Sequence, residues 1–424
     1  VVRMESLRIL LAVAAAEDLE IHQMDVVTAY LAGELEEEIY MAVPQGLTGI
    51  DGKVCRLKKG LYGLKQSARV WNRRIASELK QAGLSMIPED QSIWVDHGRN
   101  LILALYVDDI VLFARETQEI RRVKAFLADR FHMKDLGPIQ TVLGIRVQRD
   151  RAQRILRIDQ THYIQDMLKE FQYEDCRTVS TPADGYEHLQ PGTAQGAPFD
   201  VVKYQRALGQ VNWLVRGTRP DLAFVAHKLS QHCHQPYQGH WAGVQRVFRY
   251  LKHSKQLGIS YGHVKDGLIG YSDADFASDG EDRRSTMGYA YILNGGAVTW
   301  AARKQQSIST STTEAEYVAL CNASKEAVWV RNLLGHIGQG TPGAVRILGD
   351  NQGALKLVAN PEFHARSKHI DVQYHYVREL LEDGVVSVEY IPTTEMAADC
   401  LTKPLKKALF EANLRALGMG LGME

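Results

Sequence analysis

Residues Leu101–Ala114, LILALYVDDIVLFA, contain two short apolar runs on either side of the adjacent aspartates Asp108 and Asp109. Each run is too short for a helix of a soluble protein and is rich in Leu, Ile and Val. This pattern predicts a β-hairpin with both aspartates at its tip. Two carboxylates at the end of buried strands can hold divalent cations, because Mg²⁺ prefers oxygen ligands. The alternative is a solvated turn, in which Asp is common.

The composition is typical of a soluble globular protein. The length of 424 residues predicts two or three domains. Basic and acidic residues both number 50, so any nucleic-acid surface must be local rather than carried by net charge. Five widely spaced cysteines without a CxxC argue against a disulfide framework and a Cys-rich zinc site. The apolar run Ile9–Ala16 is too short to span a bilayer, and we expect no membrane partner.

The first part of the chain predicts a helix followed by a strand that carries an acid. Ser6–Leu19 has helical periodicity. Ile21–Val27 is strand-like and contains Asp25 between two apolar neighbours. A carboxylate on a largely apolar strand is costly unless it has a partner or a metal. The alternative is an edge-strand aspartate that faces water.

Two stretches are locally basic. Lys53–Arg74 interleaves basic residues with Tyr62 and Trp71, a pattern that can serve phosphates and stacked bases or can form an ordinary charged helix face. Arg146–Arg157 forms a second basic patch.

Residues 178–200 lack periodicity and predict a linker or exposed loop. Residues 201–262 predict mostly helices, and their histidine spacing fits no common zinc pattern.

From Leu268 onward the pattern predicts three strands, a helix, a strand, a helix, a strand and a final helix, which is an α/β domain with a mixed sheet. Asp273 and Asp350 end two of the strands, Glu316 lies in the first turns of the long helix, and Asp399 starts the last helix. Acids at strand ends and helix starts can converge on one edge of a sheet.

Each of these acids also has a structural interpretation. Thr313-x-x-Glu316 matches a capping box, and Ser311-x-x-Glu314 is a second possible one. Asp399 gains from a helix dipole, and Asp350 fits an ordinary turn. Four acids at four element ends within one domain favour catalysis.

Together these stretches resemble the reverse transcriptase and ribonuclease H region of the Pol polyprotein of copia-type long-terminal-repeat retrotransposons. The matching blocks occur in the family's order and cover nearly the whole chain. They are HQMDVVTAYLAGELEEEIYM, LYGLKQSARVW, YVDDIVLFA, LGPIQTVLGIRV, TRPDLAF, GYSDADFASDGEDRRSTMGY, STTEAEYVAL, GDNQGAL, HARSKHIDV and AADCLTKPL.

The resemblance implies an α+β multidomain fold. A right-hand polymerase palm and thumb, with the fingers largely missing because the chain starts after that segment, precedes a ribonuclease H-like α/β domain with a mixed sheet. The implied domains are a palm with partial fingers and the start of the thumb at 1–177, a linker and helical thumb or connection at 178–262, and the nuclease at 263–424.

For the polymerase, Asp25, Asp108 and Asp109 match the family's metal-binding carboxylates. Tyr30 matches the aromatic residue that stands against the sugar of the incoming nucleotide.

The family's nucleotide and template pocket matches Gly63, Lys65 and Gln66. Leu143 and Gly144 resemble the primer-gripping turn.

For the nuclease, Asp273, Glu316, Asp350 and Asp399 match the four metal-binding acids of ribonuclease H. Glu314 is the alternative for the glutamate, and Glu316 is preferred because the Tyr-Val-Ala-Leu that follows it better resembles the family's helix. His369 matches a recurrent family position that is auxiliary to the acids.

The resemblance also implies cofactors and partners. Each active site would use two Mg²⁺ ions, for which Mn²⁺ can substitute. The expected partners are an RNA template, a DNA primer, deoxynucleoside triphosphates, an RNA–DNA hybrid and other Pol or Gag parts of the element. The expected location is a cytoplasmic virus-like particle, with nuclear entry. The rival interpretation is a remnant with an inactive polymerase that retains only ribonuclease H or nucleic-acid binding.

Overall fold

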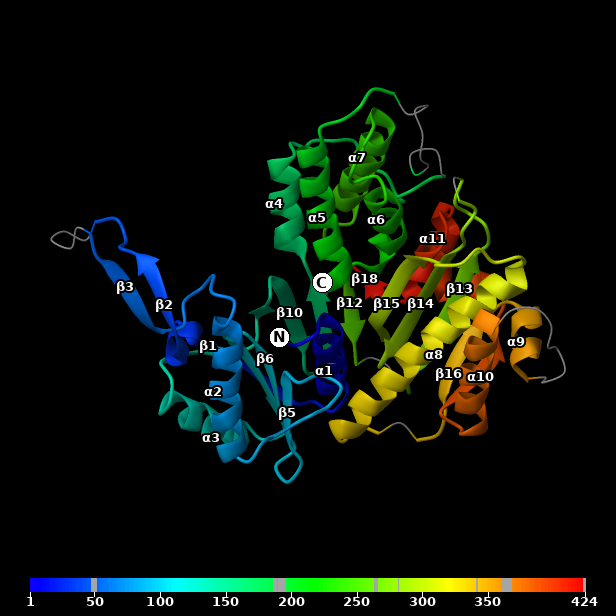
Figure 1. The fold of residues 1–424 in the computed structure, drawn as a ribbon. Helices are drawn as coiled ribbons and strands as arrows, with labels where there is room; N and C mark the ends of the chain where they lie inside the picture. Colours follow the sequence, from blue (N-terminus) through cyan, green and yellow to red (C-terminus); the bar gives the residue numbers. More distant parts are fainter. Residues whose placement is uncertain are drawn as a thin grey trace. The chain divides into compact units, whose positions relative to one another are not determined.

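The structure is a computed structural model that describes residues 1–46, 52–185, 189, 196–262, 266–280, 282–340, 342–359 and 368–421 (Figure 1). For residues 359 and 368–374 it describes the backbone only. The chain divides into two compact units, and the three-domain division at 177 and 262 stays a prediction. Among the described residues, no helix combines the length and the apolar character needed to cross a membrane. The first unit comprises Val1–Arg3 and Leu19–Ile139, and the second Met4–Asp18 and Gln140–Glu424.

The first unit contains a six-stranded sheet in the order β4-β5-β6-β7-β1-β8, with antiparallel neighbours throughout. The strands are β1 (Glu20–Val26), β4 (Ser85–Met86), β5 (Ile93–Asp96), β6 (Leu101–Tyr106), β7 (Asp109–Ala114) and β8 (Met133–Pro138). The predicted hairpin is therefore confirmed as β6 and β7. The remaining elements of this unit are η1 (Ala29–Ala32), β2 (Glu34–Ala42), β3 (Val54–Lys59), α2 (Ser67–Gln81) and α3 (Thr117–Ala128).

Both helices pack on one face of this sheet. Alternate strand residues such as Leu103 and Leu112 point to that face, as the period of two along a strand requires. They form one buried core with Ile75 of α2 and Val123 of α3. This core holds the ends of β1 and β7, where the acids lie, in a rigid frame.

The second unit contains a small antiparallel sheet in the order β18-β12-β11-β10-β9. Its strands are β9 (Thr141–Val142), β10 (Ile145–Asp150), β11 (Ile155–Asp159), β12 (Gly258–Tyr261) and β18 (Met419–Gly420). The helices that precede β12 along the chain, or begin the unit, are α1 (Met4–Ala16), α4 (Thr161–Glu170), α5 (Val201–Gly217), η3 (Pro220–Leu222), α6 (Ala223–Ser230) and α7 (Gln238–His253).

The predicted basic patch at Arg146–Arg157 is only partly a surface feature. Arg157 is fully buried, and its guanidinium donates to the carbonyl oxygens of Gln256 and Gly420. Arg146 donates to the buried carboxylate of Asp159 at 2.8 Å. These arginines join strands that are distant in sequence, so part of the local positive charge stabilises the fold.

The second unit also contains the predicted mixed sheet, in the order β15-β14-β13-β16-β17. Its first three strands along the chain are antiparallel, and β16 and β17 run parallel to β13, which confirms the predicted mixed sheet. The strands are β13 (Ile269–Asp275), β14 (Thr286–Leu293), β15 (Gly296–Lys304), β16 (Val345–Gly349) and β17 (Val386–Tyr390). The helices are α8 (Thr312–His336), α9 (Gln352–Ala359), α10 (Lys368–Glu382), η4 (Thr393–Glu395), η5 (Ala397–Leu401) and α11 (Lys407–Ala416).

The long helix α8 covers one face of this sheet (Figure 1). Tyr291 of β14 donates to the carbonyl of Ala323 in α8 at 2.6 Å. On the opposite face of β14, Gly288 lies against η5, where a Cβ would approach Leu401 Cβ to 2.8 Å. The sheet is therefore held between α8 and η5, and each of these elements carries one of the predicted acids.

Candidate functional site

The first unit brings the polymerase-like acids to one end of β1 and β7. Asp25 and Asp109 are direct partners across the two antiparallel strands. Asp108 lies in the hairpin turn, and its carbonyl accepts a hydrogen bond of 2.9 Å from the amide of Val26. Two neighbouring strands and one turn therefore position the three carboxylates.

The turn that carries Asp108 has an unusual backbone. Val107 has φ of +57°, a left-handed conformation that is costly for a β-branched residue. Its carbonyl accepts a hydrogen bond of 2.7 Å from the indole nitrogen of Trp71, which is buried in α2. The core of the unit thus holds a strained turn next to the acids, as is common at functional sites.

The acids repel one another electrostatically. Burial raises the pKa of Asp109, and the negative charges of Asp108 and Asp25 raise it further. A hydrogen bond of 3.0 Å from the amide of Gln23 opposes this effect. Such a group favours a cation among the three carboxylates, because a cation removes their repulsion.

Two tyrosines lie beside these acids. The hydroxyl of Tyr62 donates to Oδ2 of Asp108 at 3.2 Å. The ring of Tyr30 contacts that of Tyr62, with centroids 4.5 Å apart. The predicted sugar-facing residue is therefore joined to the acids through Tyr62, to which the sequence had assigned no role. The one sequence signal for a role of Tyr62 is its position in the segment Lys53–Arg74, which interleaves basic and aromatic residues.

The other predicted nucleotide-binding residues lie in the turn and helix start after β3. Gly63 has φ of +96°, which L side chains rarely adopt. Lys65 is exposed, and the amide of Gln66 donates to Glu37 at 2.9 Å. The hydrogen bond to Asp108 in this segment comes instead from Tyr62.

The predicted primer grip belongs to the second unit. Leu143 and Gly144 form the tight turn between β9 and β10, with φ of +50° and +72°. The predicted turn is therefore confirmed. That this turn contacts the primer stays a prediction.

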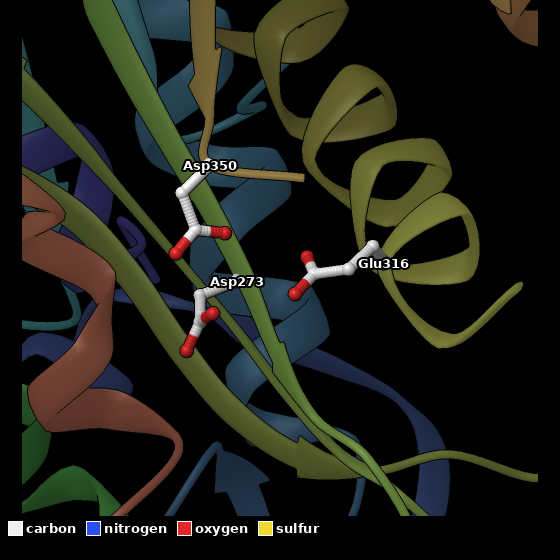
Figure 2. A group of neighbouring side chains, drawn as sticks. All are labelled: Asp273, Glu316 and Asp350. Atoms are coloured by element: carbon white, nitrogen blue, oxygen red, sulfur yellow. The ribbon is translucent and has the colours of Figure 1, made fainter. Parts of the chain in front are cut away.

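The nuclease-like acids converge in the second unit. Figure 2 shows Asp273 from β13, Glu316 from α8 and Asp350, which directly follows β16 at Gly349. One ligand oxygen from each carboxylate lies within 4.8 Å of the others. Within the described parts of the chain, this is the only such group of three or more metal-ligating side chains.

Glu314 takes the capping role instead. Its carboxylate accepts hydrogen bonds from the amide and hydroxyl of Thr310 at 2.7 and 2.6 Å. Ser311 caps the helix by accepting from the amide of Glu314. The geometry therefore brings Glu316, and not Glu314, to the other acids.

Burial and mutual repulsion perturb these carboxylates strongly. Burial raises the pKa of Glu316 to about 9, and the charges of Asp273 and Asp350 contribute to the rise. Burial also raises the pKa of Asp273, although Lys403 opposes this. Asp350 is more exposed and accepts a hydrogen bond of 2.7 Å from Thr393. Crowded, desolvated oxygen ligands of this kind suit a divalent cation.

The fourth predicted acid lies beside this group rather than within it. Asp399 lies in the 3-10 helix η5 and is fully buried, whereas the last helix starts only at Lys407, so the predicted helix-start position is wrong. Its Oδ1 lies 2.8 Å from Nζ of Lys403, and its Oδ2 has no hydrogen-bond partner among the described residues. Burial and the charge of Asp273 raise its pKa to about 7. An orphaned buried oxygen also fits a site that takes a cation.

Sequence reasoning missed three neighbours of the acids. Thr402 donates from its hydroxyl to Asp273, Lys403 pairs with Asp399, and Thr393 holds Asp350. Only Lys403 carried a local signal, because it follows Asp399 by four residues. His369 lies in α10, and its side chain is outside the described residues.

Comparison with known proteins decides the family. Residues 1–184 match the family model described as reverse transcriptase (RNA-dependent DNA polymerase). The chain is 37% identical over 429 residues to the retrovirus-related Pol polyprotein from transposon TNT 1-94 of Nicotiana tabacum. The chain belongs to the reverse transcriptase family of retrotransposon Pol polyproteins. It is also 36% identical to the Pol polyprotein from transposon RE2 of Arabidopsis thaliana.

These alignments cover 99% of the chain but only 32% and 29% of the two Pol polyproteins. Among solved structures, the chain resembles a foamy viral protease-reverse transcriptase in complex with double-stranded DNA, with a TM-score of 0.49 and 12% identity over 88% of this chain and 57% of that one. It also resembles LC11-RNase H1 in complex with an RNA/DNA hybrid, with a TM-score of 0.25 and 15% identity over 32% of this chain and 94% of that one.

Proposed function

We propose that this reverse transcriptase family member is an RNA-directed DNA polymerase that also cleaves the RNA strand of RNA–DNA hybrids. The observation that carries the nuclease half is the convergence of Asp273, Glu316 and Asp350 at one end of the mixed sheet. The polymerase half rests on the family match together with the pairing of Asp25 and Asp109 beside Asp108. Both halves share one chemical requirement, a cluster of oxygen ligands on a rigid frame.

In the nuclease, Asp273, Glu316 and Asp350 would hold Mg²⁺, and Asp399 is the candidate for a further ligand. Two bound Mg²⁺ ions would supply charge neutralisation at the phosphate and activation of the attacking water. The protein's own contribution is positional, because β13, α8 and β16 each fix one carboxylate. Thr393 and Thr402 orient two of these carboxylates by hydrogen bonds.

In the polymerase, Asp25, Asp108 and Asp109 would hold the Mg²⁺ ions. The attacking group would be the 3′-hydroxyl of a DNA primer, and the substrate a deoxynucleoside triphosphate paired to an RNA template. Tyr30 would stand against the sugar of that nucleotide. Gly63, Lys65 and Gln66 would shape the same pocket, and Leu143 with Gly144 would contact the primer.

The decisive experiment measures both activities on one sample. RNA-templated incorporation of deoxynucleotides with a DNA primer and Mg²⁺ is compared with the double variant Asp108→Asn, Asp109→Asn. Cleavage of an RNA–DNA hybrid is compared with Asp350→Asn. We expect each variant to lose its own activity and to keep the other, because the acids belong to different units.

Three results would contradict parts of this proposal. Incorporation that persists in the double variant would reject the polymerase site. Hybrid cleavage that persists in Asp350→Asn would reject the nuclease site. Hybrid cleavage without any incorporation in the unmodified chain would leave a ribonuclease H joined to an inactive polymerase.

A further inference from the structure

The nuclease site contains a basic side chain that neither the sequence motifs nor the comparisons assign. Nζ of Lys403 lies 2.8 Å from Oδ1 of Asp399 and 3.5 Å from Oδ2 of Asp273. It therefore bridges one acid of the three-acid group and the fourth acid, which lies outside that group. A unit positive charge at this point is a direct competitor for oxygens that would otherwise face a metal ion.

Local structure holds Lys403 in this position. The amides of Thr402 and Lys403 both donate to the carbonyl of Asp399, so the backbone makes one helical turn and the lysine follows its acid on the same side of that turn. The side chain is only 28% exposed. Lys403 also lines a small cavity with Phe224 and Phe410. A lysine fixed by its backbone and by packing around its stem loses little entropy when it pairs.

The charges around Lys403 are almost all negative. Asp399 and Asp273 contact it, and Asp350 adds its field from the same site. Asp221 also lines the small cavity, but its carboxylate is already paired with Arg219 at 2.7 Å. Lys403 is therefore the charge that balances the nuclease acids, and it is not shared with the buried pair nearby.

We propose that Lys403 is a resident counter-charge that keeps Asp399 apart from the other three acids and sets the affinity of the nuclease site for divalent cations. Asp273, Glu316 and Asp350 then form the first ligand set, and Asp399 becomes a ligand only when it leaves the lysine. Lys403 is a positioning residue in this scheme, because it acts through the acids. The inference takes one element from the proposed function, namely that these acids bind a divalent cation.

The test is a titration of the full chain with Mn²⁺, in which free Mn²⁺ is followed by electron paramagnetic resonance. The variants are Lys403→Met, which removes the charge, and Lys403→Arg, which keeps it. Lys407→Met is the matched control, because Lys407 is 65% exposed and pairs only with Glu411 of its own helix at 3.8 Å in the described structure. Asp350→Asn identifies the binding that belongs to the cluster.

We expect Lys403→Met to bind Mn²⁺ at least roughly 10-fold more tightly than the unmodified chain, because the substitution removes a nearby positive charge that repels the ion. Lys403→Arg and Lys407→Met should stay close to the unmodified chain. We also expect the apparent melting temperature of Lys403→Met to rise more steeply with added Mn²⁺. That second measurement reports on binding without any need for activity.

Unchanged or weaker Mn²⁺ binding in a folded Lys403→Met would overturn the inference, and so would an equal gain in Lys407→Met. Binding that is indifferent to Asp350→Asn would overturn it as well, because the ion would then lie elsewhere. Hybrid cleavage on the same samples separates the two proposals. A chain that binds Mn²⁺ at the cluster but cleaves no hybrid would contradict the proposed function, while the lysine comparison would still decide this inference.

Discussion

The indole nitrogen of Trp71 donates a hydrogen bond of 2.7 Å to the carbonyl of Val107, the residue that precedes Asp108. Helix α2 and the hairpin of β6 and β7 are thereby joined at the strained turn. The bond explains how a buried helix residue, 36 positions away in sequence, controls the backbone next to the polymerase acids.

We expect Trp71→Phe to lower the free energy of unfolding of the first unit by about 1–3 kcal/mol, because the partly buried carbonyl of Val107 loses its donor. RNA-templated incorporation should fall by about 10- to 100-fold, since small displacements of catalytic groups are costly. Urea unfolding and a primer-extension assay would measure the two effects. Trp94→Phe is the control, because the buried Nε1 of Trp94 has no hydrogen-bond partner among the described residues. Equal losses in both variants would contradict a special role for the Trp71 bond.

The two glutamates at the start of α8 should separate by function. Glu316→Gln should reduce hybrid cleavage by about 10²-fold or more, the size of effect seen when one electrostatic group is removed from an active site. Glu314→Gln weakens only the contacts with Thr310, so it should cost at most about 1 kcal/mol of stability and leave cleavage nearly unchanged. Initial rates of cleavage and thermal unfolding of both variants would test the assignment. A larger loss of cleavage in Glu314→Gln would reverse it.

A stacked histidine pair predicts acid sensitivity of the second unit. The rings of His232 and His240 are parallel, with centroids 3.8 Å apart. Burial and His240 lower the pKa of His232 to about 4, against an ordinary value of 6.5. Between pH 6.5 and 4 the unfolded chain protonates His232 and the folded chain does not. The contribution of His232 to the free energy of unfolding therefore falls as pH drops through this range.

Urea unfolding at pH 7.5, 5.5 and 4.5 would measure this dependence. Replacing His232 by Gln should flatten it, whereas replacing the exposed His253 should leave it unchanged. A slope that is the same in both variants would show that other groups control the acid response.

Helix α1 should support the second unit, although it lies between the two segments of the first unit in the sequence. The buried guanidinium of Arg8 donates to the carbonyls of Val298, Arg216 and Gly217, and it stacks on Trp300 with 3.8 Å between its Cζ and the ring centroid.

We expect Arg8→Ala to lower the free energy of unfolding by about 3 kcal/mol or more, because two buried carbonyls and one partly buried carbonyl lose a charged donor. Hybrid cleavage should then be lost at a lower urea concentration. Arg73→Ala is the control, since Arg73 is exposed and lies 3.8 Å from Glu36 at its closest. If cleavage in Arg8→Ala resists urea as in the unmodified chain, α1 is not needed for the second unit.

The sequence alone determined those strands, helices and acidic residues whose signals lie within a few neighbouring residues. The two short apolar runs in Leu101–Ala114 predicted β6 and β7 with the aspartates at their turn, because the length of each run and the polar tip between them are visible within a few residues. The order of elements after Leu268 predicted the mixed sheet for the same reason. The preference for Glu316 over Glu314 agrees with the geometry, in which each glutamate takes one of the two roles that the motif allowed.

Only the tertiary structure decided which distant groups meet. Nothing near Arg157 indicates that it is buried and binds Gln256 and Gly420, and nothing in α1 indicates that Arg8 serves the second unit. The pairing of Lys403 with Asp273 likewise joins residues that are far apart in the sequence, and it forms only when β13 and the segment after η5 pack together. Local periodicity reports which face of an element is buried, whereas the identity of its partner is settled only when the whole chain packs and each buried charge must find a neighbour.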